Sequence, residues 1–237
     1  MRGPGGPGFG EGKVVTANPL TAKIVVTHEN TLSDGNHISR TEQTTLYRDS
    51  QGRTRREMTV DAATPATGSV KHSIITINDP VSGNRYMLDP TNKTARQMPL
   101  DPRDHPGHSK SGDGTKGPDG SSMSAAKSGL SENAQRDQLG TKTIEGYQAT
   151  GERMTRTIPA GEIGNEKPIN VVTERWFSSD LQLPLMVVHT DPLMGTATTK
   201  VSSVNRSEPD ASLFQVPPDY KIVTGRRNEP FYVPLQR

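Results

Sequence analysis

The sequence lacks cysteine altogether, and this absence removes several kinds of chemistry at once. None of its 237 residues is a thiol. The chain therefore forms no disulfide and offers no thiolate nucleophile, no thiolate zinc site and no attachment point for a c-type haem. An absence of thiols is compatible with the cytosol and with export from a bacterial cell.

Apolar and aromatic residues are scarce as well. Hydrophobic residues make up 30% of the chain and aromatic residues 4%, beside 23 glycines and 19 prolines. This composition predicts a small core for the length, with part of the chain lacking a core. No apolar run approaches the ~18 residues of a membrane-spanning helix. Lysine and arginine number 28 against 26 acidic residues, a net charge of +2, which disfavours a general nucleic-acid binder.

What the sequence does have is the pattern of short strands. Thr, Val and Ile dominate residues 13–98, and turn signals recur at short intervals. The Asp-Gly pair at 34–35 favours a tight turn, and Asp-Pro pairs at 79–80 and 89–90 end strands because proline donates no ladder hydrogen bond. Strand-type sequence resumes from 141 to 223. We predict an all-β fold, an antiparallel meander forming a curved sheet or an open half-barrel.

The pattern divides the chain into five segments. These are a Gly/Pro-rich lead-in at 1–12, the two halves of the β domain at 13–98 and 141–223, a Gly/Ser/Pro-rich insertion at 99–140, and an extended tail at 224–237. The insertion contains no Val, Ile, Phe, Tyr or Trp, so it buries too little to offset its ordering entropy and should be flexible. At most a short helical turn is expected around 124–138.

The Gly/Pro-rich lead-in indicates where the protein is located. A Gly/Pro stretch is typical of a mature chain after removal of a signal peptide, or of an engineered terminus. On the first interpretation the protein is exported, to the periplasm or the extracellular space.

Enzyme motifs are missing from the sequence. It contains no P-loop, no Gly-x-Ser-x-Gly elbow and no His-Glu-x-x-His, and no local arrangement indicates a catalytic triad. We therefore predict no catalytic residue, no cofactor and no enzymatic activity. Single histidines on predicted strands are expected to be surface or structural residues; these are His28, His37, His72 and His189.

One group of residues has the spacing of metal ligands: Asp101, Asp104, His105 and His108. It lies in the predicted flexible insertion, where neither rigid geometry nor outer-shell support is assured. No metal site is predicted, and metal binding by this group is left open.

The strongest basic patch comprises Arg53, Arg55 and Arg56, with Arg40 and Arg48 nearby. On a strand, Arg53 and Arg55 share one face, and Arg56 points to the other face with Met58. We favour a solvated, salt-bridged sheet face; the alternative is a phosphate or polysaccharide site.

Four segments carry a resemblance to known proteins. They are YRDSQGRTR at 47–55, INDP at 77–80, IPAGEIGN at 158–165 and LFQVP at 213–217. Over residues 14–223 the chain resembles an uncharacterised group of exported proteins of soil bacteria, a likeness that implies no activity.

The C-terminal half more distantly resembles the periplasmic lipoprotein-carrier superfamily. The shared features are Trp176, Leu183-Pro184, Gly195 and Leu213-Phe214. This likeness implies a curved antiparallel sheet folded as an open half-barrel. An acyl-chain carrier needs many large apolar side chains around its ligand, and this chain has 1 Trp, 4 Phe and 5 Tyr, which argues against a carrier.

The sequence thus favours a non-catalytic exported structural or interaction protein that self-associates into a homo-oligomer or filament. The predicted interaction residues are Phe231, Tyr232, Val233 and Leu235. Flanking prolines hold them extended, and an exposed apolar strand is expected to dock on a sheet edge, of another copy or of its own domain. The alternative is a periplasmic binding or carrier protein for a hydrophobic ligand such as a lipid or lipoprotein. Neither a nucleic-acid partner nor a transmembrane segment is expected.

Overall fold

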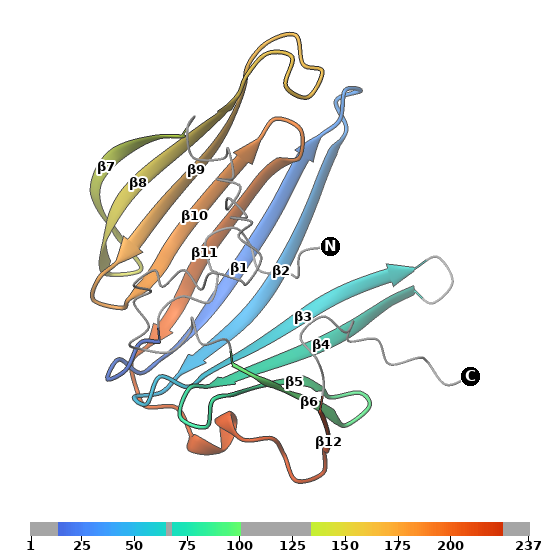
Figure 1. The fold of residues 1–237 in the computed structure, drawn as a ribbon, viewed down its shortest axis with the longest axis vertical. Coiled ribbons are helices and arrows are strands. Elements are labelled where there is room, and N and C mark those ends of the chain that lie inside the picture. The colour runs from blue at the N-terminus through green and yellow to red at the C-terminus, as the bar shows by residue number, and fades with distance from the viewer. Residues whose placement is uncertain (1–13, 65–67, 101–133, 225–237) are drawn as a thin grey trace, which may run out of the picture. The chain divides into compact units, whose positions relative to one another are not determined.

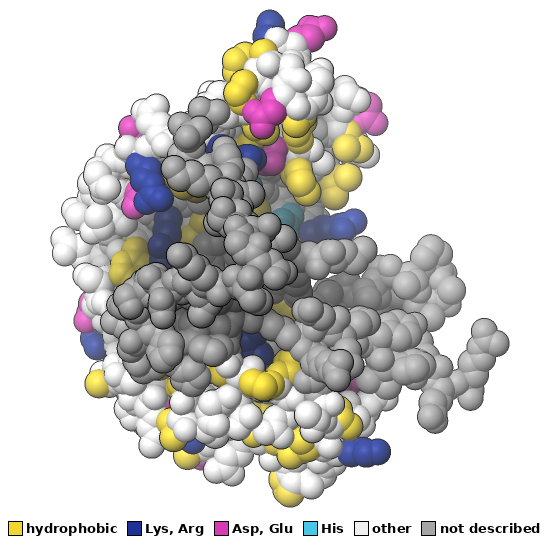
Figure 2. All heavy atoms as spheres, viewed as in Figure 1, with side chains coloured by type: hydrophobic (Ala, Val, Ile, Leu, Met, Phe, Trp, Pro, Cys, Tyr) yellow, Lys and Arg dark blue, Asp and Glu magenta, His cyan; other side chains and the backbone are white. Residues whose placement is uncertain are grey.

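A computed structural model describes residues 14–64, 68–100 and 134–224. These residues form twelve strands and one 3₁₀ turn, η2 (Ala211–Phe214). The strands are β1 (Leu20–Thr31), β2 (His37–Arg48), β3 (Thr54–Thr64), β4 (Gly68–Asp79), β5 (Asn84–Asp89), β6 (Thr94–Pro99), β7 (Ala134–Ile144), β8 (Tyr147–Ile158), β9 (Ile169–Ser178), β10 (Leu183–Asp191), β11 (Gly195–Asn205) and β12 (Lys221–Thr224). On the face drawn in Figure 2, polar side chains and backbone cover most of the described surface.

The strands form one sheet in the order β12-β6-β5-β4-β3-β2-β1-β11-β10-β9-β8-β7 (Figure 1). Two meanders, β1 to β6 and β7 to β11, are joined where β1 lies beside β11. The order has two different ends, β12 and β7, so the sheet is open. The prediction of an all-β antiparallel meander with an open sheet is confirmed.

One pair departs from the antiparallel pattern, since β12 runs parallel to β6. A parallel partner needs a crossover connection. Residues 206–220, which include η2, supply it by returning the chain to the β6 edge.

Contacts divide the described residues into two compact units. The first contains residues 26–41 and 134–201; the second contains 14–25, 42–100 and 202–224. Each unit takes residues from both predicted halves, because β1, β2 and β11 contribute to both.

In the first unit, a tight hairpin joins β7 to β8. Glu145 and Gly146 both have positive φ, 52° and 80°, the requirement of a two-residue type I′ turn. Buried side chains of this unit come mainly from β9, β10 and the turn between them: Val171, Trp176, Leu181, Leu183, Leu185 and Val187.

In the second unit, one buried cluster lies on one face of β4 to β6. Ile77, Leu88, Ala95 and Phe214 form a buried cluster there. The strand residues share this face because Ile75 pairs with Leu88 and Leu88 pairs with Ala95. Phe214 of η2 covers them from outside the sheet.

The structure differs from the prediction at the insertion. β7 begins at Ala134 and pairs with β8 from there, so residues 134–140 are strand, and the helical turn expected at 124–138 is wrong over 134–138. Polar residues on both faces of this edge strand hide its periodicity, since an edge strand need not bury either face. The rest of the insertion, 101–133, lies outside the described residues, as do the lead-in and residues 225–237 of the tail.

Candidate ligand-binding face

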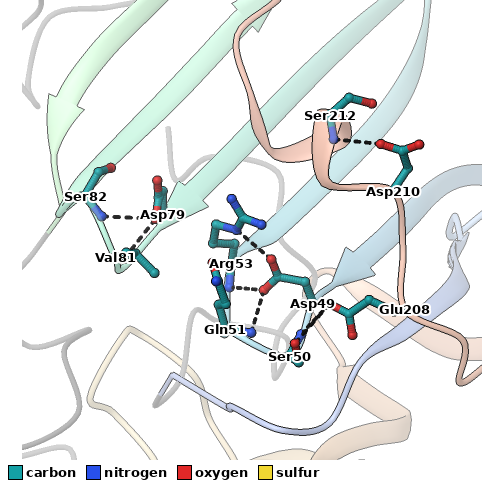
Figure 3. A network of polar contacts seen from close by, with 10 residues as sticks. All are labelled: Asp49, Ser50, Gln51, Arg53, Asp79, Val81, Ser82, Glu208, Asp210 and Ser212. Atoms are coloured by element: carbon teal, nitrogen blue, oxygen red, sulfur yellow. Dashed lines mark hydrogen bonds and ion pairs between the residues drawn. The ribbon is translucent and has the colours of Figure 1, made fainter.

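The turn between β2 and β3 is closed by a buried carboxylate. The Asp49 side chain accepts hydrogen bonds from the backbone N–H of Gln51 at 3.0 Å and of Arg53 at 2.8 Å, and pairs with Arg53 Nε (Figure 3). Only 1% of Asp49 is exposed. These partners belong to its own turn, so its role is to hold that turn.

The same turn holds the crossover that leads to η2. Ser50 donates from its N–H and its hydroxyl to Glu208 Oε1, at 3.0 and 3.1 Å (Figure 3). The Arg53 guanidinium lies 5.1 Å from the Phe214 ring centroid, and Arg55 Nη1 donates to the Leu213 carbonyl at 3.0 Å. Segments 47–55 and 213–217, two of the four that resemble the exported proteins of soil bacteria, therefore contact each other. Their contacts hold the crossover against β3.

On the face of β3 that carries Arg53 and Arg55, the arginines of the basic patch make structural contacts within the protein. Arg53 pairs with Asp49, and Arg55 Nε pairs with Glu57 Oε1 at 2.7 Å. Both arginines are salt-bridged as predicted, but this face is not the solvated one that was expected, because Arg55 is buried. Arg56 follows the prediction too, because its pairing with Leu46 and Thr76 places it on the opposite face, together with Met58.

Three strands repeat one pattern on that opposite face. β3 has Arg56-x-Met58, β5 has Arg85-x-Met87 and β6 has Arg96-x-Met98. Residues two apart on a strand share a face, and the cross-strand register brings the three pairs together: Met87 lies opposite Arg96 and beside Thr76, which pairs with Arg56. Arg48 joins this face from β2, next to Leu46.

We call this side of β2 to β6 the arginine face; its defining side chains are Arg48, Arg56, Arg85, Arg96, Met58, Met87 and Met98. Directly opposed side chains are ~5 Å apart and diagonal ones ~7–8 Å. Arg85 and Arg96 are diagonal neighbours across β5 and β6, and Arg48 and Arg56 are diagonal neighbours across β2 and β3. The two arginine pairs stand on either side of β4.

Hydrogen bonds hold part of this face in place. Arg85 Nε donates to Asn78 Oδ1 at 2.7 Å, and Asn78 Nδ2 donates to Thr54 Oγ1 at 3.2 Å. Arg48 Nε donates to the Asn18 carbonyl at 2.8 Å, and burial lowers the pKa of Arg48 to about 10. Arg48 therefore stays charged at neutral pH in a poorly solvated position.

Most side chains that define the arginine face are partly exposed. Arg56, Arg85, Arg96, Met58 and Met87 are all half-buried. A guanidinium offers a planar fork of donors to carboxylate or phosphate, and methionine provides an adaptable apolar surface. Their alternation suits a molecule that is both apolar and anionic.

Sequence reasoning found Arg56 and missed Arg85 and Arg96. The signal that could have found them is the thrice-repeated Arg-x-Met itself, on three segments predicted to be strands. Placing the three copies on one face needs the register, which the sequence alone does not supply.

Two histidines of the strands have local hydrogen-bond partners. His189 Nδ1 lies 2.9 Å from Thr173 Oγ1, and His37 Nδ1 lies 3.0 Å from Thr31 Oγ1, as expected of satisfied strand histidines. Within the described ranges, no group of three or more His, Cys, Asp or Glu could hold a metal ion. The group Asp101, Asp104, His105 and His108 lies outside those ranges, as do Phe231, Tyr232, Val233 and Leu235.

No helix in the described part of the chain combines the length and apolar character needed to span a membrane.

No family model and no curated protein matches the sequence. Among solved structures, an uncharacterised conserved protein from Thermus thermophilus is 12% identical, with a TM-score of 0.44 over 88% of this chain and 91% of that one. MucB of Pseudomonas aeruginosa, solved with MucA, is 13% identical, with a TM-score of 0.44 over 88% of this chain and 59% of that one. A LolA superfamily protein from Nitrosomonas europaea is 6% identical, with a TM-score of 0.33 over 84% and 90%.

The expected likeness to the lipoprotein-carrier superfamily is thus found among the structural matches. The identities and scores are too low to indicate a shared function.

Proposed function

We propose that the protein is an exported, non-catalytic binding or carrier protein whose arginine face holds an acyl chain bearing an anionic headgroup. The observation that supports this proposal is the repeated Arg-x-Met of β3, β5 and β6, which places three arginines and three methionines on one face, all of them half-buried except the buried Met98. Met58 and Met87 would contact the chain, and Arg56 and Arg96 would pair with the headgroup.

A charge-assisted hydrogen bond contributes ~1.5–3 kcal/mol, and 1.4 kcal/mol corresponds to tenfold in affinity. The double variant Arg56→Gln/Arg96→Gln should therefore bind at least about tenfold more weakly. The probe is a fluorescent polyene fatty acid, titrated into the full chain at constant ionic strength. Its methyl ester, which keeps the chain and loses the charge, should also bind at least about tenfold more weakly.

The matched control is Arg175→Gln, which removes the same charge from an exposed arginine of the first unit, 5.1 Å from the Phe177 ring. It should bind the fatty acid as the wild type does. A lysophospholipid titrated in parallel separates a phosphate headgroup from a carboxylate. Equal binding of acid and ester, or equal loss in all variants, would rule out the arginine face as the site.

Self-association through strand addition is the second proposal. It is supported by β12, an edge strand of four exposed residues that presents Ile222 at 52% and Val223 at 37% exposure. The predicted contact residues Phe231 to Leu235 lie just beyond it in the sequence. Deletion of residues 229–237 followed by light scattering tests it: an unchanged mass in solution would contradict assembly through the tail.

A further inference from the structure

Three connections of the first unit expose large apolar side chains at their tips. The β1–β2 hairpin presents Leu32 and Ile38, each 40% exposed; the β8–β9 loop presents Ile163 at 57%; the β10–β11 turn presents Leu193 at 60% and Met194 at 78%. Single exposed apolar residues need no explanation, but a gathered set marks an interaction site.

These three tips lie at one end of the sheet. β8, β9, β10 and β11 pair antiparallel in succession, so the β8–β9 and β10–β11 connections emerge at the same end. The β10–β11 turn also lies against the end of β1: a Cβ at Gly195 would overlap the Glu29 carbonyl and lie 3.1 Å from Asn30 Cα. Figure 1 shows the three connections at the upper end of the sheet, with the β8–β9 loop reaching beyond the β10–β11 turn.

The spacing of the tips follows from the strand spacing. Neighbouring strands are ~4.8 Å apart, and adjacent hairpins are centred two strands apart. Measured across the strands, neighbouring tips are therefore ~10 Å apart. Together they form a row ~20 Å long.

Hydrogen bonds within the turns fix the tips. Asp191 Oδ1 accepts from the Leu193 N–H at 2.8 Å, and Asn165 Nδ2 donates to the carbonyls of Pro159 and Lys167, both at 2.8 Å. The apolar side chains are thus presented on closed turns rather than on open loops.

The row is acidic although the chain as a whole is not. Its three connections and the strand ends that flank them, residues 29–38, 159–168 and 191–195, contain five carboxylates and one lysine, against a net charge of +2 for the whole chain. The carboxylates are Glu29, Asp34, Glu162, Glu166 and Asp191. Figure 2 shows acidic side chains among the hydrophobic ones at this end.

We infer that this row of tips docks a basic amphipathic helix of a partner protein. Apolar tips surrounded by carboxylates complement an apolar stripe flanked by Lys and Arg. A helix rises 1.5 Å per residue, so a tip spacing of ~10 Å corresponds to about seven residues. The partner helix should present apolar residues at seven-residue intervals, over about two heptads. An anionic membrane is disfavoured, because its negative surface repels the same carboxylates.

The test is selection from a displayed library of random 18-residue peptides on the full chain. Enriched peptides should carry net positive charge and apolar residues seven apart. They should bind the variant Leu193→Ser/Met194→Ser at least about tenfold more weakly than the wild type, and their affinity should fall as salt rises. Val81→Ser is the matched control: Val81 is 68% exposed on the β4–β5 turn of the second unit, and its loss should leave binding unchanged.

Circular dichroism checks that both variants keep the wild-type thermal midpoint. The variant Arg56→Gln/Arg96→Gln should bind the selected peptides as the wild type does. The proposal for the row of tips and the proposal for the arginine face are therefore tested separately. Three results would overturn the inference: no enrichment, enrichment of acidic or uncharged peptides, or equal binding to the Leu193→Ser/Met194→Ser variant. Tip-dependent flotation with zwitterionic vesicles in the absence of peptide enrichment would assign the row to a membrane surface instead.

Discussion

Gly151 of β8 allows Trp176 of β9 to lie directly against the backbone. An added Cβ at position 151 would come within 2.6, 2.7 and 2.8 Å of three carbons of the indole ring. Trp176 is the only tryptophan of the chain and is 8% exposed, and the Lys142 ammonium lies 3.7 Å from its ring centroid. The substitution Gly151→Ala therefore forces the ring to move.

Two opposing terms set the size of the effect. Replacing glycine by alanine within a strand normally stabilises by ~0.5–1 kcal/mol, because alanine loses less backbone freedom on folding. Overpacking a well-filled site costs ~1–3 kcal/mol. We expect the second term to dominate, with a net loss of about 1–2 kcal/mol in the free energy of unfolding.

Urea unfolding measures this loss, and the emission maximum of Trp176 should shift to longer wavelength in the folded variant as the ring is displaced. A double-mutant cycle with Trp176→Leu, followed by circular dichroism, isolates the contact. In the Trp176→Leu background, Gly151→Ala should be neutral or stabilising. An equal cost in both backgrounds would refute the packing of the ring on Gly151.

Three further predictions concern turns. Gly195→Ala should cost at least about 1 kcal/mol more than Gly35→Ala in urea unfolding, because φ is +90° and +83° respectively but only position 195 lies against the Glu29 backbone; equal costs would contradict that contact. Asp49→Asn should destabilise by about 2–3 kcal/mol, whereas Asp79→Asn, at a half-buried turn, should cost less than about 1 kcal/mol. Asp210 is the N-cap of η2, and its side chain accepts from the Ser212 N–H, which lowers the pKa of Asp210 from its ordinary value of 3.8. Its contribution to stability is therefore present above pH 3.8 and is lost as the pH falls through the folded pKa. Asp210→Asn should reduce the dependence of the thermal midpoint on pH below about 4, and an unchanged dependence would contradict this cap.

The strands were predictable where aspartate marks their ends. Asp79 accepts from the N–H groups of Val81 and Ser82, and Asp89 does the same for Thr91 and Asn92. These contacts make local turn chemistry visible in the sequence. β7 was not predictable over 134–140, because an edge strand without a buried face has no hydrophobic period.

The parallel position of β12 was not predictable either. Nothing local in residues 221–224 specifies β6 as their partner. Their place follows from long-range contacts of the preceding crossover, such as Ser50 with Glu208 and Arg55 with the Leu213 carbonyl.

For the candidate site, the sequence predicts which face of its own strand a side chain occupies, but not which strands lie next to each other. Alternation alone places Arg56 opposite to Arg55, and the structure gives these neighbours different surroundings: Arg55 bonds Glu57 and the Leu213 carbonyl, while Arg56 lies on the arginine face. Joining Arg56 to Arg85 and Arg96 needs the pairing of β3 with β4 and of β5 with β6, which depends on contacts across the sheet.

The scarcity of aromatic residues, which argues against an acyl-chain carrier at the level of composition, loses its force once the face is known. That argument assumes that a lipid-binding surface must be lined by aromatic and branched side chains. Methionine and the methylene stem of arginine both provide apolar contact area, and that stem ends in a positively charged guanidinium. A face built from Arg-x-Met repeats therefore offers apolar surface and positive charge from the same strands, which suits a ligand with an anionic head better than an aromatic pocket would.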